Sequence, residues 1–230
     1  MRAVLCKELG MPDSLVVEEV PDLIAGAGQV LISVEACGVN FPDTLIIQGK
    51  YQFKPELPFS PGGEISGVIK QVGPDVDNLK IGDRVIAFST WGGFAEELVV
   101  DHTRTVTISD KMDYEKASAF VLTYGTSYHA LKDRAHLRKG ETLLVLGASG
   151  GVGIAAIQLG KAMGATVIAA ASNAEKLSMC KENGADHLIN YAVDDLRQCV
   201  KAITQGRGVD VIYDPVGGSF SEKALRDMSW

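Results

Sequence analysis

Cysteine is sparse in this chain of 230 residues, which has four cysteines and no Cys-x-x-Cys pair. Cys6, Cys37, Cys180 and Cys199 are scattered, so they predict neither a disulfide framework nor a zinc knuckle and are typical of a reduced, cytoplasmic protein. Basic residues are also few, 22 against 29 acidic ones, and no basic block offsets the net charge of -7. This balance argues against a general nucleic-acid-binding surface.

Long apolar runs are missing as well. No stretch approaches the roughly 20 residues that a membrane-spanning helix needs. The N-terminus reaches Lys7 and Glu8 after only a short apolar stretch, so we expect neither a membrane span nor a secretory signal. What is present is ordinary globular material, 46% hydrophobic and 22% charged, in a length that suits one large domain or two modest ones.

The two halves of the chain follow different patterns. Up to residue 118, short runs rich in Val and Ile are separated by glycines, which predicts a β-rich domain with one helix near 41–48. From residue 119 onward, apolar strand-like segments alternate with helix-like ones, after a helical stretch at 115–137 that is expected to break near Gly125. The continuous apolar strands indicate burial on both faces, so this half is predicted to be a parallel sheet covered by helices.

Four glycines lie within seven residues in the segment GASGGVG, which joins a strand-like run to a helix of small residues. In this context glycines let backbone N–H groups approach a pyrophosphate, and the helix N-terminus adds a partial positive charge. The alternative is a plain strand-to-helix turn, which needs only one or two glycines. The turn therefore predicts a dinucleotide site made by Gly147, Ser149, Gly150, Gly151, Val152 and Gly153.

The end of the second strand indicates which dinucleotide is bound. NAD-binding units usually carry an acid there for the ribose 2′-hydroxyl, whereas this chain has Ala170 through Asn173 and no acid before Glu175. A 2′-phosphate is therefore permitted, and NADPH is the predicted cofactor, with Ser172 and Lys176 as candidate ligands. Two alternatives stay open, because Ser172 and Glu175 also form a capping box and Lys176 also fits a solvated surface charge.

Several segments of the chain, in their order, carry a family resemblance. They are ACGVNFPDTLIIQGKY, LPFSPGGEISGVI, VGPDVDNLKIGDRV, LTYGTSYHAL, GASGGVGIAAIQLGK, NGADHLINY and GVDVIYDPVGG. Together they resemble the zinc-independent quinone oxidoreductases of the medium-chain dehydrogenase/reductase superfamily, the zeta-crystallin group. The resemblance implies an α/β protein with a GroES-like β-rich catalytic domain at 1–118 and a Rossmann domain, a doubly wound parallel sheet, at 119–230. It further implies NADPH in the cleft between them, and reduction of quinones or related α,β-unsaturated carbonyls by hydride transfer.

The resemblance also bears on zinc. Zinc-dependent relatives carry a cysteine where this chain has Asn40 and a histidine where it has Gly63, and the cysteine-rich lobe of their structural zinc is missing. Because Asn and Gly are poor zinc ligands, we expect no metal.

The family pattern implies catalytic positions in the first half. Asn40 and Asp43 resemble the pair at the nicotinamide end of the cleft, and Tyr51 resembles the tyrosine that faces the substrate. Asn40 and Tyr51 are candidate donors to the developing oxyanion, with the final proton coming from solvent or Tyr51. The alternatives are an Asx turn and helix cap for Asn40 and Asp43, and a half-buried aromatic position for Tyr51. Phe53 and Phe59 are candidates either for the walls of a planar substrate slot or for core packing.

Two further cofactor positions are implied in the second half. Thr126 matches the threonine that approaches the nicotinamide carboxamide, and Tyr191 lies where relatives contact the 2′-phosphate of the adenosine. The alternatives are helix capping beside Gly125 for Thr126 and a plain aromatic position after a strand for Tyr191.

One departure from the family concerns length. The predicted fourth strand of the Rossmann domain, at 209–213, is followed by few residues, whereas a sheet of order 3-2-1-4-5-6 needs two further strands. We therefore expect a Rossmann domain without its last strands in a truncated chain, and a homodimer only in a full-length form. The functional alternatives are a non-catalytic nucleotide-binding module, an inactive truncated form, or an enoyl-thioester reductase.

Overall fold

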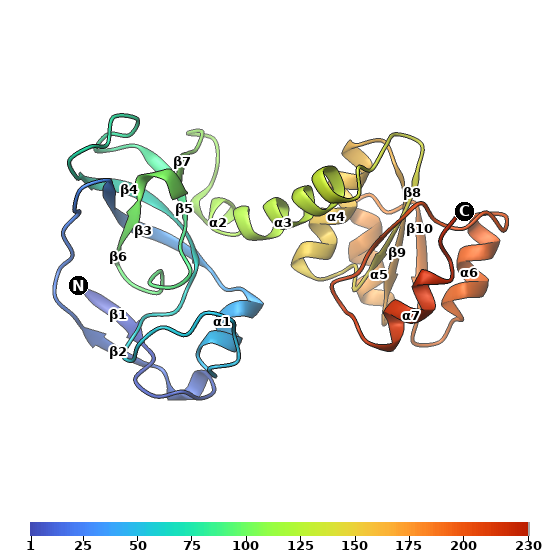
Figure 1. Ribbon diagram of the computed structural model, residues 1–230, viewed down its shortest axis with the longest axis horizontal. Helices are drawn as coiled ribbons and strands as arrows, with labels where there is room; N and C mark the ends of the chain where they lie inside the picture. Colours follow the sequence, from blue (N-terminus) through green and yellow to red (C-terminus); the bar gives the residue numbers. More distant parts are fainter. Residues whose placement is uncertain (230) are drawn as a thin grey trace. The chain divides into compact units, whose positions relative to one another are not determined.

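The computed structural model describes residues 1–229 and divides the chain into two compact units, Met1–Leu122 and Thr123–Trp230. The boundary expected from the sequence, after residue 118, lies shortly before this division. In Figure 1 the first unit runs from blue to green and the second from yellow-green to red.

The first unit is built on a five-stranded antiparallel sheet in the order β6-β3-β4-β5-β7, while β1 and β2 pair separately within the described residues (Figure 1). The strands are β1 (Arg2–Leu5), β2 (Val16–Glu19), β3 (Gln29–Gly38), β4 (Glu64–Val72), β5 (Arg84–Phe88), β6 (Glu97–Asp101) and β7 (Thr105–Thr107). Successive side chains of a strand point to opposite faces, so one face gathers Ile32, Ile65 and Val85 into a buried core. The predicted β-rich half is confirmed.

Short helices complete the first unit. They are α1 (Phe41–Ile46), α2 (Tyr114–Ala117) and two 3₁₀ turns, Pro12–Ser14 and His102–Arg104. α1 begins after Asn40 and has Pro42 in its first turn, where a fixed φ suits the helix and the missing N–H has no partner to lose. The helix expected near 41–48 is therefore confirmed, although it ends at Ile46.

The second unit contains a parallel sheet in the order β10-β9-β8-β11 within residues 1–229. Its strands are β8 (Thr142–Leu146), β9 (Thr166–Ala171), β10 (His187–Asn190) and β11 (Val211–Tyr213), and its helices are α4 (Gly151–Ala162), α5 (Ala174–Glu182), α6 (Leu196–Ile203) and α7 (Ser219–Leu225). In chain order this is the 3-2-1-4 arrangement of a Rossmann sheet, as predicted.

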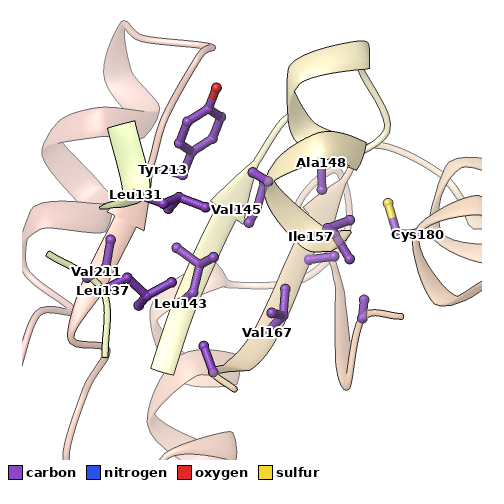
Figure 2. Packing of buried hydrophobic residues seen from close by; sticks show 14 residues of the cluster. Leu131, Leu137, Leu143, Val145, Ala148, Ile157, Val167, Cys180, Val211 and Tyr213 are labelled. Atoms are coloured by element: carbon purple, nitrogen blue, oxygen red, sulfur yellow. The ribbon is translucent and has the colours of Figure 1, made fainter. Parts of the chain in front are cut away.

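Both faces of β8 are buried, which explains its unbroken apolar sequence. Leu143 packs with Ile157 of α4 and Cys180 of α5 in one core, shown in Figure 2. Its neighbour Leu144 belongs to a second core with Val200 of α6. Because side chains alternate between the faces of a strand, helices must cover both sides, and the predicted parallel sheet follows from this burial.

The segment that runs across the boundary of the units is helical without the expected break. A π-helical turn (Val121–Gly125), α3 (Thr126–Tyr128) and a second π-helical turn (His129–Arg134) follow one another. Gly125 has φ and ψ of -61° and -46°, so the break expected near Gly125 is wrong. A glycine weakens a helix through its conformational entropy but does not clash, and neighbouring helix-forming residues can carry it.

The helices are short. The stretch Gly151–Ala162 of α4 has 12 residues, and among residues 1–229 no helix combines the length and the apolar composition needed to cross a membrane.

Candidate functional site

A cavity of about 250 Å³ lies in the first unit. Its walls include all three residues assigned there from the sequence, Asn40, Asp43 and Tyr51, together with Phe53 and Leu122. These side chains come from the start of α1, from the loop that follows it and from the end of the first unit. The cavity therefore brings the predicted catalytic residues together.

Asp43 uses its carboxylate to hold main chain. It is 6% exposed, and it accepts a hydrogen bond from the backbone N–H of Asn40, with 2.7 Å between N and Oδ2. The N–H groups of Gly62 and Gly63 also donate to this carboxylate and favour its charged form, but burial is the larger effect and raises the pKa of Asp43. The contacts match the helix-cap alternative and leave Asp43 little acceptor capacity for a substrate.

Glu64 was not identified as a site residue from the sequence. It is the first residue of β4, its side chain is completely buried, and its Oε2 lies 3.3 Å from Nδ2 of Asn40. Its other oxygen, Oε1, accepts a hydrogen bond from the N–H of Leu122 at 3.0 Å. The signal in the sequence was an acid at the head of a strand whose next residues are mostly apolar, in the same motif as Gly63.

Tyr51 and Phe53 form the aromatic part of the cavity. Their ring centroids are 5.9 Å apart at an interplanar angle of 59°, and Phe53, which lines the cavity, is 50% exposed. Tyr51 also packs against a buried cluster that contains Phe59. Phe59 itself is 6% exposed and belongs to that core, so of the two phenylalanines only Phe53 contributes to the described cavity wall.

The glycine turn of the second unit follows β8 and leads into α4. Gly147 has φ of +57°, a conformation that side chains rarely adopt. A Cβ on Gly153 would lie 2.6 Å from the carbonyl oxygen of Ala148, so this glycine permits close packing of the turn against α4. The protein's own packing therefore requires glycine at these two positions.

Gly150 differs from Gly147 and Gly153, because the protein's own packing does not require glycine there. Its surroundings therefore indicate whether the turn suits a phosphate. A Cβ there would meet only the carbonyl oxygen of Gly147, at 3.4 Å, which is ordinary contact, and the backbone is not in the left-handed region. No side chain caps α4 at Gly150, so the first N–H groups of the helix, from Gly151, Val152 and Gly153, have no partner within the helix. An open backbone position beside these donors fits the close approach of an anion. Ser149 is half-buried in the same turn.

The residues that follow β9 show which side chain caps α5. α5 is capped by Asn173, whose side-chain oxygen accepts from the N–H of Lys176 at 2.9 Å, and not by Ser172 with Glu175. Ser172 instead accepts a hydrogen bond from the Lys176 ammonium, with 3.2 Å between Nζ and Oγ. The capping-box alternative for Ser172 is therefore wrong, and its hydroxyl and the Lys176 amine form a polar pair at the carboxyl end of the sheet.

Tyr191 lies directly after β10 at the same edge of the sheet. Its N–H donates to the carbonyl oxygen of Ala171 at 3.1 Å, which places its main chain next to the residue before Ser172. The half-buried ring packs on Phe220, with 4.9 Å between centroids. The packing matches the structural alternative for the ring, and the position matches the predicted cofactor edge.

Thr126 is exposed at the start of α3, and Gly125 beside it is helical, so capping does not explain this threonine. Its neighbour Ser127 is buried and donates to the carbonyl oxygen of Val152 at 2.9 Å. Thr123, which sequence reasoning did not select, has its Cγ2 within 3.1 Å of where a Cβ of Gly151 would be. The helical segment therefore packs against the glycine turn through Thr123 and Ser127.

Metal ligands do not converge in the described part of the chain. Over residues 1–229 there is no group of three or more His, Cys, Asp or Glu side chains placed to hold a metal ion.

Comparisons with known proteins match both units. A profile described as "Alcohol dehydrogenase GroES-like domain" matches residues 26–110, and one described as "Zinc-binding dehydrogenase" matches residues 151–228. The profile that names zinc thus covers the second unit, not the segment that contains Asn40 and Gly63.

Two curated relatives and one solved structure are similar over the whole chain. The quinone oxidoreductase-like protein 2 homolog of Nematostella vectensis is 41% identical over 231 residues, which cover 100% of this chain and 63% of the relative. The quinone oxidoreductase of Pongo abelii is 40% identical and is covered to 70%. The structure of Escherichia coli quinone oxidoreductase complexed with NADPH has a TM-score of 0.94 at 30% identity, over 100% of this chain and 70% of that one.

The chain thus spans a little under two thirds of the Nematostella relative and somewhat more of the other two proteins. Its matched domains, their order and the identity along its whole length agree with the motifs found in the sequence. The chain belongs to the zeta-crystallin-like quinone oxidoreductase group of the medium-chain dehydrogenase/reductase superfamily.

Proposed function

We propose that this chain carries the machinery of an NADPH-dependent reductase of quinones or related α,β-unsaturated carbonyls, which works without zinc. The observation that carries the proposal is the cavity of the first unit, where the Asn40 amide and the Tyr51 ring lie beside the apolar Phe53. Such a cavity can orient a planar carbonyl compound and stabilise charge on its oxygen, which is what hydride transfer from a bound cofactor requires.

The second unit would hold the cofactor at the carboxyl edge of its sheet. The N–H groups of Gly151, Val152 and Gly153 at the start of α4 are the proposed pyrophosphate ligands, with Ser149 and Gly150 beside them in the same turn. Thr126 is proposed to contact the carboxamide end. When bound, NADPH supplies the hydride. The relative from Escherichia coli, named as complexed with NADPH, supports this choice of cofactor class.

NADPH is preferred over NADH in this proposal because of the groups that follow β9 and β10. Ser172 and Lys176 form a polar pair with one positive charge, and no acid occupies the end of β9. Tyr191 follows β10 next to them. A 2′-phosphate would gain a charge-assisted hydrogen bond from Lys176, whereas a 2′-hydroxyl would gain much less.

The residues of the first unit would act on the substrate. Asn40 can donate a hydrogen bond to the carbonyl oxygen on which negative charge develops, and the Tyr51 hydroxyl can donate a second or deliver the final proton. Phe53 offers an apolar face to a planar ring. Asp43 is proposed to act indirectly, since its carboxylate holds the first turn of α1, from which Asn40 projects. Zinc has no role here, because Asn40 and Gly63 stand where zinc-dependent relatives carry their ligands.

Quinone-dependent oxidation of NADPH by the 230-residue chain tests the proposal. We expect turnover with 1,4-benzoquinone, and a loss of kcat of about a hundredfold in Asn40→Ala, the size expected when one oxyanion donor is removed. Asn78→Ala is the matched control, since Asn78 is exposed in the same unit, does not line the cavity and bonds to His102 through its side chain.

The other outcomes separate the alternatives. Turnover with a 2-enoyl thioester but not with quinones would make the protein an enoyl-thioester reductase. Cofactor binding without turnover of either substrate would contradict the catalytic proposal and leave a nucleotide-binding module. Equal kcat for Asn40→Ala and the wild type would remove Asn40 from the mechanism.

A further inference from the structure

Glu64 is a buried carboxylate that the proposed chemistry does not use. Its side chain has no exposed surface, and it is not among the residues that line the cavity of the first unit. A carboxylate in such a place is costly unless it is hydrogen-bonded, so its partners show what it is there to hold. Those partners include the backbone N–H of Val121 and, lining the cavity, Asn40 and Leu122.

Asn40 and Leu122 each offer Glu64 an N–H group. Nδ2 of Asn40 is 3.3 Å from Oε2, and the backbone nitrogen of Leu122 is 3.0 Å from Oε1. An ionised carboxylate only accepts hydrogen bonds. It therefore takes one N–H of the Asn40 NH₂ group, Oδ1 of Asn40 is turned away from it, and the second N–H of that group is not used by Glu64.

The orientation of this carboxamide matters because its two ends have opposite hydrogen-bonding character. One end is a pure acceptor and the other carries two donors, and the two ends are otherwise alike in size. Without a partner that distinguishes them, Asn40 could present either end to a substrate. Its backbone is already fixed, since the Asn40 N–H donates to Asp43 at 2.7 Å. The Asn40 side chain also faces the N–H of Asp43 in a capping box, but without a cap hydrogen bond, so Glu64 is the partner that hydrogen-bonds the amide.

We propose that Glu64 is a positioning residue, which selects one of the two orientations of the Asn40 carboxamide and ties it to the main chain at Leu122. The inference rests on the proposed function in so far as Asn40 contacts the substrate. Glu64 distinguishes the two ends of the Asn40 amide because its carboxylate is charged and only accepts hydrogen bonds. The size of the Glu64 side chain does not make this distinction.

Glutamine at this position should reverse the orientation. The N–H of Leu122 is part of the backbone and cannot turn over, so it keeps the oxygen of the new side-chain amide. The NH₂ of that new amide then faces Asn40, whose own NH₂ must rotate away to offer Oδ1. Glu64→Gln is therefore expected to keep the fold while placing Oδ1 of Asn40, an acceptor, where the wild type offers an N–H to the substrate oxygen.

A control with the same chemical change is available in the same sheet. Glu97 of β6 is also buried, at 9% exposure, but its carboxylate pairs with Lys70 and does not line the cavity. Glu97→Gln removes a buried charge without touching Asn40, so it reports the general effect of losing a carboxylate from this unit.

Kinetics in two backgrounds test the positioning role. With quinone and NADPH, we expect Glu64→Gln to lower kcat about tenfold with a smaller change in KM, since the misplaced group acts mainly in the transition state. In an Asn40→Ala background the same exchange should lower kcat less than about twofold, because the residue it positions is gone. Equal losses in both backgrounds would overturn the proposal and leave Glu64 as a structural residue. So would a loss in Glu97→Gln as large as that in Glu64→Gln.

A measurement that needs no turnover separates this inference from the proposed function. The side-chain NH₂ signals of Asn40 in a ¹⁵N NMR spectrum can be assigned by their absence in Asn40→Ala. We expect them to shift in Glu64→Gln and to stay in place in Glu97→Gln. Unchanged Asn40 signals in Glu64→Gln would refute the positioning role even in an active enzyme. A shift in a protein without quinone turnover would support it while the proposed function fails.

Discussion

The two units build their sites in different ways. The cavity of the first unit depends on residues far apart in the sequence, because the Asn40 side chain donates to Glu64, which also accepts from the backbone N–H of Leu122. The proposed cofactor site of the second unit is mostly backbone, and its core is the contiguous turn Gly147–Gly153. A contiguous backbone site is visible in a sequence as a local motif, whereas a site of converging side chains emerges only once the sheet has formed.

The largest expected effect is a loss of stability on substitution in the glycine turn of the second unit. An alanine at Gly153 would bring Cβ to 2.6 Å from a backbone oxygen, which cannot move aside like the tip of a side chain. We expect Gly153→Ala to lower the free energy of unfolding by about 3 kcal/mol, measured by urea denaturation. Gly150→Ala, where Cβ meets its neighbour at 3.4 Å, is the control and should change stability by less than about 0.5 kcal/mol. Similar losses in both variants would show that the two glycines do not differ as described.

A smaller effect is expected where the sequence suggested the wrong cap for α5. Asn173→Ala removes the hydrogen bond to the N–H of Lys176 and should lower the free energy of unfolding by about 1 kcal/mol. Ser172→Ala should leave stability within about 0.3 kcal/mol of the wild type, because Ser172 does not cap the helix. Thermal unfolding of the two variants side by side measures the difference. A larger loss in Ser172→Ala would restore the capping box inferred from the sequence.

The smallest expected effect is the dependence of stability on pH in the first unit. Burial, and to a lesser extent the nearby Asp43, raises the pKa of Glu64, although N–H groups and Asn40 oppose this. As pH rises above the ordinary pKa of a glutamate, the unfolded chain releases the proton before the folded protein does, so stability falls through that window up to the raised pKa. Glu64→Gln removes this contribution, while that of Asp43, whose pKa is also raised, remains. Urea unfolding from about pH 4 to about pH 7 should therefore give a shallower fall for the variant, and an unchanged slope would contradict this assignment.

The features that could be predicted from the sequence are the local ones, and those that depend on distant contacts could not. The order of the parallel strands, the burial of β8 on both faces and the glycine turn were predictable, because each depends on local periodicity or a local motif. The π-helical course through Gly125 and the Asn173 cap were not, since several polar residues compete for a helix end and tertiary packing decides between them. In the first unit, Asn40, Asp43 and Tyr51 came from a resemblance. Glu64 escaped notice because the feature that singles it out is a hydrogen bond to a residue 24 positions away.

Binding of nicotinamide cofactors is the measurement that tests the central claim most directly. The 230-residue chain is titrated with NADPH and with NADH, followed by cofactor fluorescence, beside the Gly150→Ala variant. The account predicts saturable binding that is about tenfold tighter for NADPH, and a clear loss of affinity in Gly150→Ala without loss of stability. No binding of either cofactor, or equal affinity of the wild type and Gly150→Ala for NADPH, would contradict the assignment of the glycine turn as the cofactor's phosphate site.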